Sequence, residues 1–201
     1  CLGGYSSARL GKPVKTSGLF REFLVEAPKI VPVEMSQTAE GVKFEGAHSG
    51  YVPPFGLTHA RKLSLSLDGR SLVGEDLLIA LNDTTGKAAE TVLSEDIDLN
   101  VDFQIRFHLH PEVDAALDLG GTTVAIAAKS GEIWIFRHES SLFLTIEPGV
   151  YLEKNQPTPR ASRQIVLSGM VNDALTRAQW SLSKTQDTAM AIRDLRLEEL
   201  R

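Results

Sequence analysis

The sequence lacks paired cysteines, long apolar runs and clusters of basic residues, and each absence excludes a class of protein. It has one cysteine, Cys1, so no disulfide can form within the chain. No apolar run approaches the roughly 20 residues that a membrane-spanning helix needs. The net charge is -5, and Lys and Arg form no cluster of the kind that binds phosphates. These absences argue against a disulfide-stapled fold, a membrane partner and a nucleic-acid partner.

The composition is that of a globular protein with its own core. Of 201 residues, 42% are hydrophobic and 23% are charged, which suffices for one domain. The chain begins at Cys1 rather than at Met, and no targeting segment is recognisable there, which predicts a piece cut from a longer protein. The residues themselves therefore leave the compartment unknown.

Alternation of apolar and polar residues predicts an all-β fold. In residues 100–110, Phe103, Ile105 and Phe107 face one side, while Gln104, Arg106 and His108 face the other. Further strands are expected at residues 19–25, 30–35, 41–45, 142–146, 163–167 and 178–183. About ten strands must split into two packed antiparallel sheets, a β-sandwich over residues 1–186. Residues 82–100 are expected to form a mobile loop, and residues 187–201 a charged tail or a short C-terminal helix.

The first hairpin can be placed with its register. Asp68 and Gly69 favour a two-residue type I′ turn. This turn sets Arg61 opposite Asp76, and Lys62 opposite Glu75 on the other face. Two pairs of opposite charge from one register support the assignment.

A second hairpin is expected to turn at Ser130 and Gly131. With a two-residue loop, Ala125 faces Phe136, Ala127 faces Trp134, and residue 126 faces residue 135. Small residues opposite large ones are typical of central strands covered on both sides. Core packing of Trp134 and Phe136 is therefore favoured over a stacking platform for sugar rings.

Several segments in this order resemble the C-terminal sandwich of heparinase II/III-like polysaccharide lyases. They are residues 48–51 (HSGY), 55–61 (FGLTHAR), 65–69 (LSLDG), 74–76 (GED), 103–111 (FQIRFHLHP), 131–136 (GEIWIF), 146–147 (IE), 151–152 (YL) and 163–167 (RQIVL). The resemblance implies an α/α toroid before the sandwich, with the active site between the two. It also implies β-elimination of uronic-acid-containing glycans such as glycosaminoglycans, in a bacterial protein of the periplasm or outside the cell.

The same resemblance implies no catalytic residue in this chain. In the family, the catalytic Tyr and Asn or His lie on the toroid. A further His and the ligands of a metal such as zinc lie in HxH-containing and AHN-like motifs at the start of the sandwich. Neither motif precedes His48 here, and the HxH of His108 and His110 sits mid-chain before Pro111. The chain alone is therefore expected to be inactive and to hold no cofactor.

Four residues are candidates for binding an acidic sugar: His48, Tyr51, Arg106 and His108. Arg can hold a carboxylate with two hydrogen bonds, and His48 and Tyr51 are expected in a Gly- and Pro-rich loop. The competing interpretations are a solvated sheet face for Arg106 and His108, and a loop anchor for His48 and Tyr51. His108 and His110 are weak metal candidates, because no third ligand follows from the spacing.

His59 and Arg61 are expected near the rim of the sheet. They share parity with the inward leucines of their strand, and a buried Arg must be paired. Asp76 is the partner that the register supplies, so a structural salt bridge is favoured over ligand binding.

Two functions remain open on the sequence. The first is an accessory domain that forms one wall of a lyase cleft and stabilises the toroid. The second is an independent carbohydrate-binding or assembly module that never lay beside a toroid. They differ in whether the chain binds an oligosaccharide without a partner domain.

Overall fold

The chain folds as an antiparallel β-sandwich. The computed structural model describes residues 1–80, 100–154, 156 and 158–185, so the expected loop at 82–100, apart from its last residue, and the tail at 187–201 lie outside the described residues. The strands are β1 (Arg9–Leu10), β2 (Val14–Thr16), β3 (Leu19–Arg21), β4 (Leu24–Glu26), β5 (Val33–Thr38), β6 (Gly41–Tyr51), β7 (Leu57–Ser66), β8 (Ser71–Ala80), β9 (Val101–His108), β10 (Asp114–Asp118), β11 (Thr123–Ala127), β12 (Ile133–His138), β13 (Phe143–Tyr151), β14 (Arg160–Val171) and β15 (Leu175–Thr185). Within the described ranges, the helical pieces are one α-turn, α1 (Val52–Phe55), and one 3₁₀ turn at Leu119–Gly121. The all-β prediction is confirmed.

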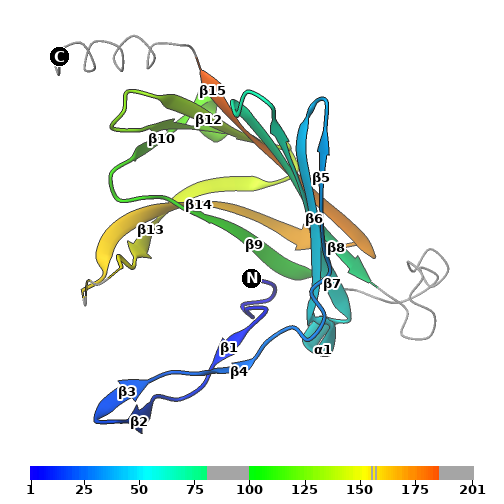
Figure 1. The fold of residues 1–201 in the computed structure, drawn as a ribbon. Helices are drawn as coiled ribbons and strands as arrows, with labels where there is room; N and C mark the ends of the chain where they lie inside the picture. The colour runs from blue at the N-terminus through cyan, green and yellow to red at the C-terminus, as the bar shows by residue number, and fades with distance from the viewer. Residues whose placement is uncertain (81–99, 155, 157, 186–201) are drawn as a thin grey trace.

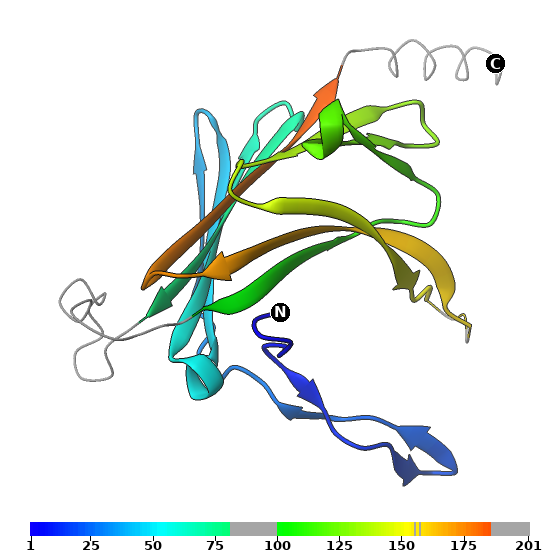
Figure 2. The same ribbon diagram turned by 180° about the vertical axis from the view of Figure 1, so that it is seen from behind.

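Two sheets form the sandwich. The larger has eight strands in the order β10-β11-β12-β15-β8-β7-β6-β5, and the smaller has three in the order β13-β14-β9. Figure 1 shows the smaller sheet crossing one face of the larger one. Two short ladders, β1 with β4 and β2 with β3, project away from both sheets in the two opposite views of Figures 1 and 2.

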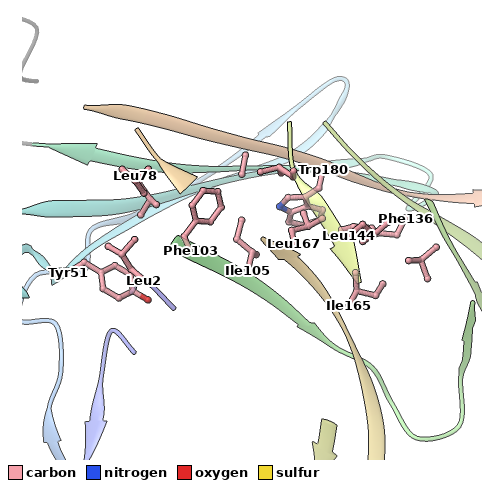
Figure 3. Packing of buried hydrophobic residues seen from close by; sticks show 14 of the residues in the cluster. Leu2, Tyr51, Leu78, Phe103, Ile105, Phe136, Leu144, Ile165, Leu167 and Trp180 are labelled. Atoms are coloured by element: carbon pink, nitrogen blue, oxygen red, sulfur yellow. The ribbon is translucent and has the colours of Figure 1, made fainter. Parts of the chain in front are cut away.

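The core lies between the two sheets. Phe103, Ile105 and Ile165 of the smaller sheet meet Phe136 and Trp180 of the larger one (Figure 3). The Phe107 ring lies 4.7 Å from the Trp180 ring and 4.9 Å from the Phe136 ring, centroid to centroid. These distances are typical of favourable aromatic packing, which fixes β9 against β12 and β15.

Trp180 fits because its neighbour on β8 is a glycine. Gly74 pairs with Trp180 in the ladder, and a Cβ at position 74 would overlap the indole ring. A small residue thus faces a large one on β8 and β15, whereas the expectation of alanines facing Trp134 and Phe136 in the second hairpin is wrong. Gly74 pairs with Leu63 on its other side, and its contact with Trp180 depends on a long-range pairing that local pattern does not reveal.

The register of the first hairpin is confirmed, but its turn type is wrong. Arg61 pairs with Asp76 and Lys62 with Glu75. Of the two turn residues only Gly69 has a positive φ, of 66°, so the turn is not type I′. The N–H of Gly69 donates to the carbonyl of Ser66, within a loop longer than two residues.

The register of the second hairpin differs by one residue from the prediction. Phe136 pairs with Val124, and Trp134 with Ile126. The N–H of Ala128 donates to the carbonyl of Glu132, and Gly131 has a φ of 84°, so the loop has three residues, 129–131. A third loop residue with positive φ is a common hairpin solution and shifts every pair by one. Phe136 is nevertheless buried and Trp134 packs half-buried against the core.

The N-terminal strands are more divided than expected. The single strand predicted over residues 19–25 is split between β3 and β4, whereas β6 is longer than predicted and reaches Tyr51. His48 and Tyr51 therefore lie in a strand rather than in the Gly- and Pro-rich loop expected for them. Among the described residues, no helix has both the length and the apolarity to cross a membrane.

Candidate functional site

A pocket of about 320 Å³ opens between β9 and the face of β6, β7, β8 and β15. It gathers all four predicted sugar-binding residues, together with the predicted pair of Arg61 and Asp76. The lining residues are Cys1, Ser7, His48, Tyr51, His59, Arg61, Asp76, Leu78, Phe103, Gln104, Ile105, Arg106, His108, Thr176 and Ala178. The pocket is therefore both polar and bounded by core side chains, as ligand sites commonly are.

Asp76 is the buried centre of this pocket. Its side chain is 3% exposed, and Oδ1 accepts hydrogen bonds from His59 Nε2 and Arg61 Nε, each at 2.7 Å. Oδ2 accepts from the indole Nε1 of Trp180 at 2.9 Å. Burial raises the pKa of Asp76, but the hydrogen bonds from His59, Arg61 and Trp180 outweigh it and leave the pKa below its ordinary value. Asp76 is therefore a carboxylate with three donors.

His48 and His59 continue this network towards the pocket. They lie opposite each other on β6 and β7, and His48 Nε2 is 3.1 Å from His59 Nδ1. The N–H of Gly50 donates to His48 Nδ1 at 3.2 Å, so Nδ1 is unprotonated and Nε2 carries the proton. His48 Nε2 then donates to His59 Nδ1, and His59 Nε2 donates to Asp76.

The directions of these bonds keep His48 neutral. Burial, and then the nearby His59, the N-terminal ammonium and Arg61, lower the pKa of His48. A second proton on Nδ1 would also confront the Gly50 N–H. Both ring nitrogens of both histidines are thus occupied, and the network acts first as a support for Asp76.

Arg106 and His108 reach the pocket from β9. Arg106 Nη1 donates to Glu147 at 2.7 Å, and Nη2 donates to Gln104 at 2.6 Å. The side chain of His108 is exposed and has no hydrogen-bond partner in the described part of the chain. Arg106 is therefore largely committed to protein acceptors, whereas the His108 imidazole is open to a ligand.

Tyr51 is a buried lining residue of the pocket. It is 7% exposed, and its ring lies 5.4 Å from that of His48. Burial raises the pKa of Tyr51, and hydrogen bonds with Ser7 offset only part of this rise. The Tyr51 hydroxyl therefore stays protonated at neutral pH.

His110 lies apart from the pocket. Its ring packs at 4.9 Å against Tyr151, and its Nδ1 accepts from the N–H of Glu112 at 3.2 Å. Among residues 1–80 and 100–185, apart from the undescribed 155 and 157, no three His, Cys, Asp or Glu side chains are grouped so as to hold a metal. The structure brings His108 to the pocket but not its partner in the HxH pair.

Two members of the site were not found from the sequence. Trp180 donates to Asp76 across a strand pairing that spans more than 100 residues of sequence, and Ser7 reaches Tyr51 from the N-terminal segment. The contact between His48 and His59 was also missed. It follows from the pairing of β6 with β7, which the short connection through α1 sets, and recognising that connection as a hairpin would have revealed it.

The comparison with protein families decides the identity of the domain. Residues 1–186 match the family model described as "Heparinase II/III-like, C-terminal". The chain belongs to this family. Among solved structures, heparan sulfate lyase HepC from Pedobacter heparinus is similar with a TM-score of 0.60 and 10% identity, over 78% of this chain and 22% of that one. A crystal structure of heparinase III is similar with a TM-score of 0.55 and 13% identity, also over 78% and 22%.

A curated relative is closer in sequence than these structures. FtsZ-localized protein C of Caulobacter vibrioides is 29% identical over 165 residues, which cover 82% of this chain and 27% of that protein. This heparinase II/III-like domain thus spans about a quarter of the length of the proteins it matches. The low identity to the lyases supports the shared fold alone.

Proposed function

We propose that this domain forms one wall of a cleft that binds an acidic polysaccharide, and that an α/α toroid elsewhere in the parent protein forms the other wall. The observation that carries the proposal is the pocket at β6 to β9. It brings Arg61, Arg106 and His108 together; Asp76 is the acidic residue among its described lining residues, and Arg106 is paired with Glu147 beside it. A local cationic site of this kind can hold a uronate carboxylate despite the net charge of -5.

The parent would cleave its glycan by β-elimination, and this domain would not supply the acid and base. Elimination needs one group that takes the proton beside the carboxylate and another that assists the leaving oxygen. The nitrogens of His48 and His59 are engaged with Gly50, each other and Asp76. His108 is the one candidate imidazole of this pocket without a hydrogen-bond partner among the described residues; we assign the remaining acid–base group to the toroid, with any metal held upstream.

The projecting ladders support contact with another domain. Seven large apolar side chains of residues 10–25 are each more than half exposed: Leu10, Val14, Leu19, Phe20, Phe23, Leu24 and Val25. Contiguous exposed apolar surface commonly marks an interface. The ladders have only two strands each and no core of their own, which a docked domain would supply.

The test compares the 201-residue chain with the longer protein that contains it. Both are incubated with hyaluronan, heparan sulfate and polygalacturonate, and unsaturated uronate products are followed by ultraviolet absorbance. The longer protein should release product from one of these glycans, and the 201-residue chain from none. Turnover by the short chain, or inactivity of the longer protein on every acidic glycan, would count against the proposal.

A second candidate function rests on the relative with the higher identity. The 29% identity to FtsZ-localized protein C favours an assembly role at the division site, in place of glycan cleavage. In that case a fluorescent fusion of the longer protein should gather where FtsZ does and should disperse when FtsZ is depleted. A uniform distribution in cells with intact FtsZ rings would reject this candidate.

A further inference from the structure

Arg61 differs from Arg106 in how its guanidinium is used. Only Nε of Arg61 is bonded, to Asp76 Oδ1, and neither terminal nitrogen has a partner among the described residues. The side chain is 36% exposed and lines the pocket. Both terminal nitrogens of Arg106, by contrast, donate to protein acceptors. Arg61 therefore presents the outer edge of its guanidinium to whatever enters.

The network behind Arg61 holds this edge in place. Asp76 bonds the inner nitrogen, and Asp76 is itself fixed by Trp180 on one oxygen and by His59 on the other. His48 then braces His59 from β6. A side chain that is already ordered loses little conformational freedom when it binds, so the ligand gains affinity that a mobile surface Arg would not give.

We propose that Arg61 is the principal anchor for one oxyanion, a carboxylate or a sulfate, at this pocket, and that Asp76, His59 and His48 are its positioning residues. The two terminal nitrogens of a guanidinium match the two oxygens of such a group in a bidentate pair. His108 lies on the facing strand as a further donor, and Arg106 takes a secondary role. The identity of the ligand as an acidic glycan rests on the proposed function, but the oxyanion site does not.

The experiment titrates the 201-residue chain with three probes. Hyaluronan tetrasaccharide offers carboxylates without sulfate, inorganic sulfate offers the oxyanion alone, and chitotetraose offers a neutral sugar. Affinity is measured by calorimetry, and the NMR signal of the Trp180 indole N–H reports the site, because that group shares Asp76 with Arg61. Hyaluronan tetrasaccharide should bind and shift this signal, and chitotetraose should not.

The variants separate the two arginines. Arg61→Gln should weaken hyaluronan binding by roughly 10- to 100-fold, the loss expected for charge-assisted hydrogen bonds. Arg61→Lys keeps the charge without the planar pair, and should also weaken binding by roughly tenfold. The matched control is Arg177→Gln on β15, whose Nε pairs with Glu75 outside the pocket, and it should leave affinity unchanged. If Arg61→Gln unfolds the domain, the affinity of the Arg61→Lys variant for hyaluronan tetrasaccharide tests the role of Arg61 instead.

The outcomes distinguish this inference from the proposed function. Sulfate binding that depends on Arg61, without any hyaluronan binding, supports the oxyanion site and rejects hyaluronan as its glycan. Hyaluronan binding that falls in Arg106→Gln but not in the Arg61 variants overturns Arg61 as anchor and leaves the function standing. No response of the wild-type chain to either anionic probe overturns the oxyanion site, and the turnover test of the longer protein then decides the proposed function separately.

Discussion

At the scale of single residues, Asp76 determines the shape of the pocket. Its two oxygens receive three side-chain donors from β7 and β15, so one carboxylate ties together strands that are distant in sequence. Such a group is costly to bury alone and stabilising only when every donor and acceptor is satisfied. Its removal would leave the indole N–H of Trp180 and the His59 N–H without an acceptor.

Asp76→Ala should therefore destabilise the domain by about 2–4 kcal/mol, the range expected when a buried hydrogen-bonded ion pair loses one partner. Urea unfolding followed by circular dichroism measures this loss. The control is Glu26→Ala, which breaks the exposed pair with Arg9 and should change the free energy of unfolding by less than about 0.5 kcal/mol. Equal effects of the two substitutions would contradict the role given to Asp76.

His48 makes the stability depend on pH in a defined direction. Its pKa in the folded chain is lowered from 6.5, so below that pH the unfolded chain takes up the proton first. The stabilisation is complete above pH 6.5 and is lost as the pH falls through the lowered folded value. The free energy of unfolding should decrease between pH 7 and pH 5, and His48→Gln should flatten this decrease. His110→Gln, outside the pocket, should keep the wild-type profile, and a flattened profile there would refute the assignment.

The residues of the site could be predicted from the sequence better than their roles. Arg61 with Asp76 followed from one hairpin register, and His48, Tyr51, Arg106 and His108 do converge on one pocket. The different roles of Arg61 and Arg106 could not be predicted from the sequence, because they depend on which acceptors lie near each guanidinium. Glu147, on β13, bonds Arg106 but leaves Arg61 free, and this contact comes from the packing of separate strands.

At the scale of elements, the two hairpins show what local pattern can specify. Charge pairing fixed the first register even though the turn was assigned the wrong type. The register of the second hairpin was placed from the loop length and from small residues facing large ones, and neither of these fixes a register. A Ser-Gly sequence is compatible with loops of two or three residues, and the three-residue loop shifted Phe136 from Ala125 to Val124.

The three-residue loop of the second hairpin should require glycine at position 131. Its φ of 84° lies in the left-handed region, where a Cβ costs about 1 kcal/mol. Gly131→Ala should lower the free energy of unfolding by about this amount. Gly131→Asn should lower it less, because Asn tolerates left-handed backbone. Urea unfolding of both variants tests this, and an Ala variant as stable as the Asn variant would contradict the loop geometry.

At the scale of the whole molecule, the projecting ladders should be the part most changed by the remainder of the parent. Two-stranded ribbons are marginal in water, so the amides of β1 to β4 should exchange with deuterium rapidly in the 201-residue chain. In the longer protein the same amides should be protected. Phe20→Ser should remove this protection, because Phe20 is 74% exposed in the isolated domain and would contribute its ring to the interface.

Phe143→Ser is the matched control for that measurement. Phe143 is 76% exposed, as Phe20 is, but it lies on β13 of the smaller sheet rather than on the ladders. Its loss should leave the protection of β1 to β4 in the longer protein intact. If the ladders exchange equally fast in both proteins, the apolar side chains of residues 10–25 are not an interdomain surface. This domain would then have to contact the toroid through a different surface.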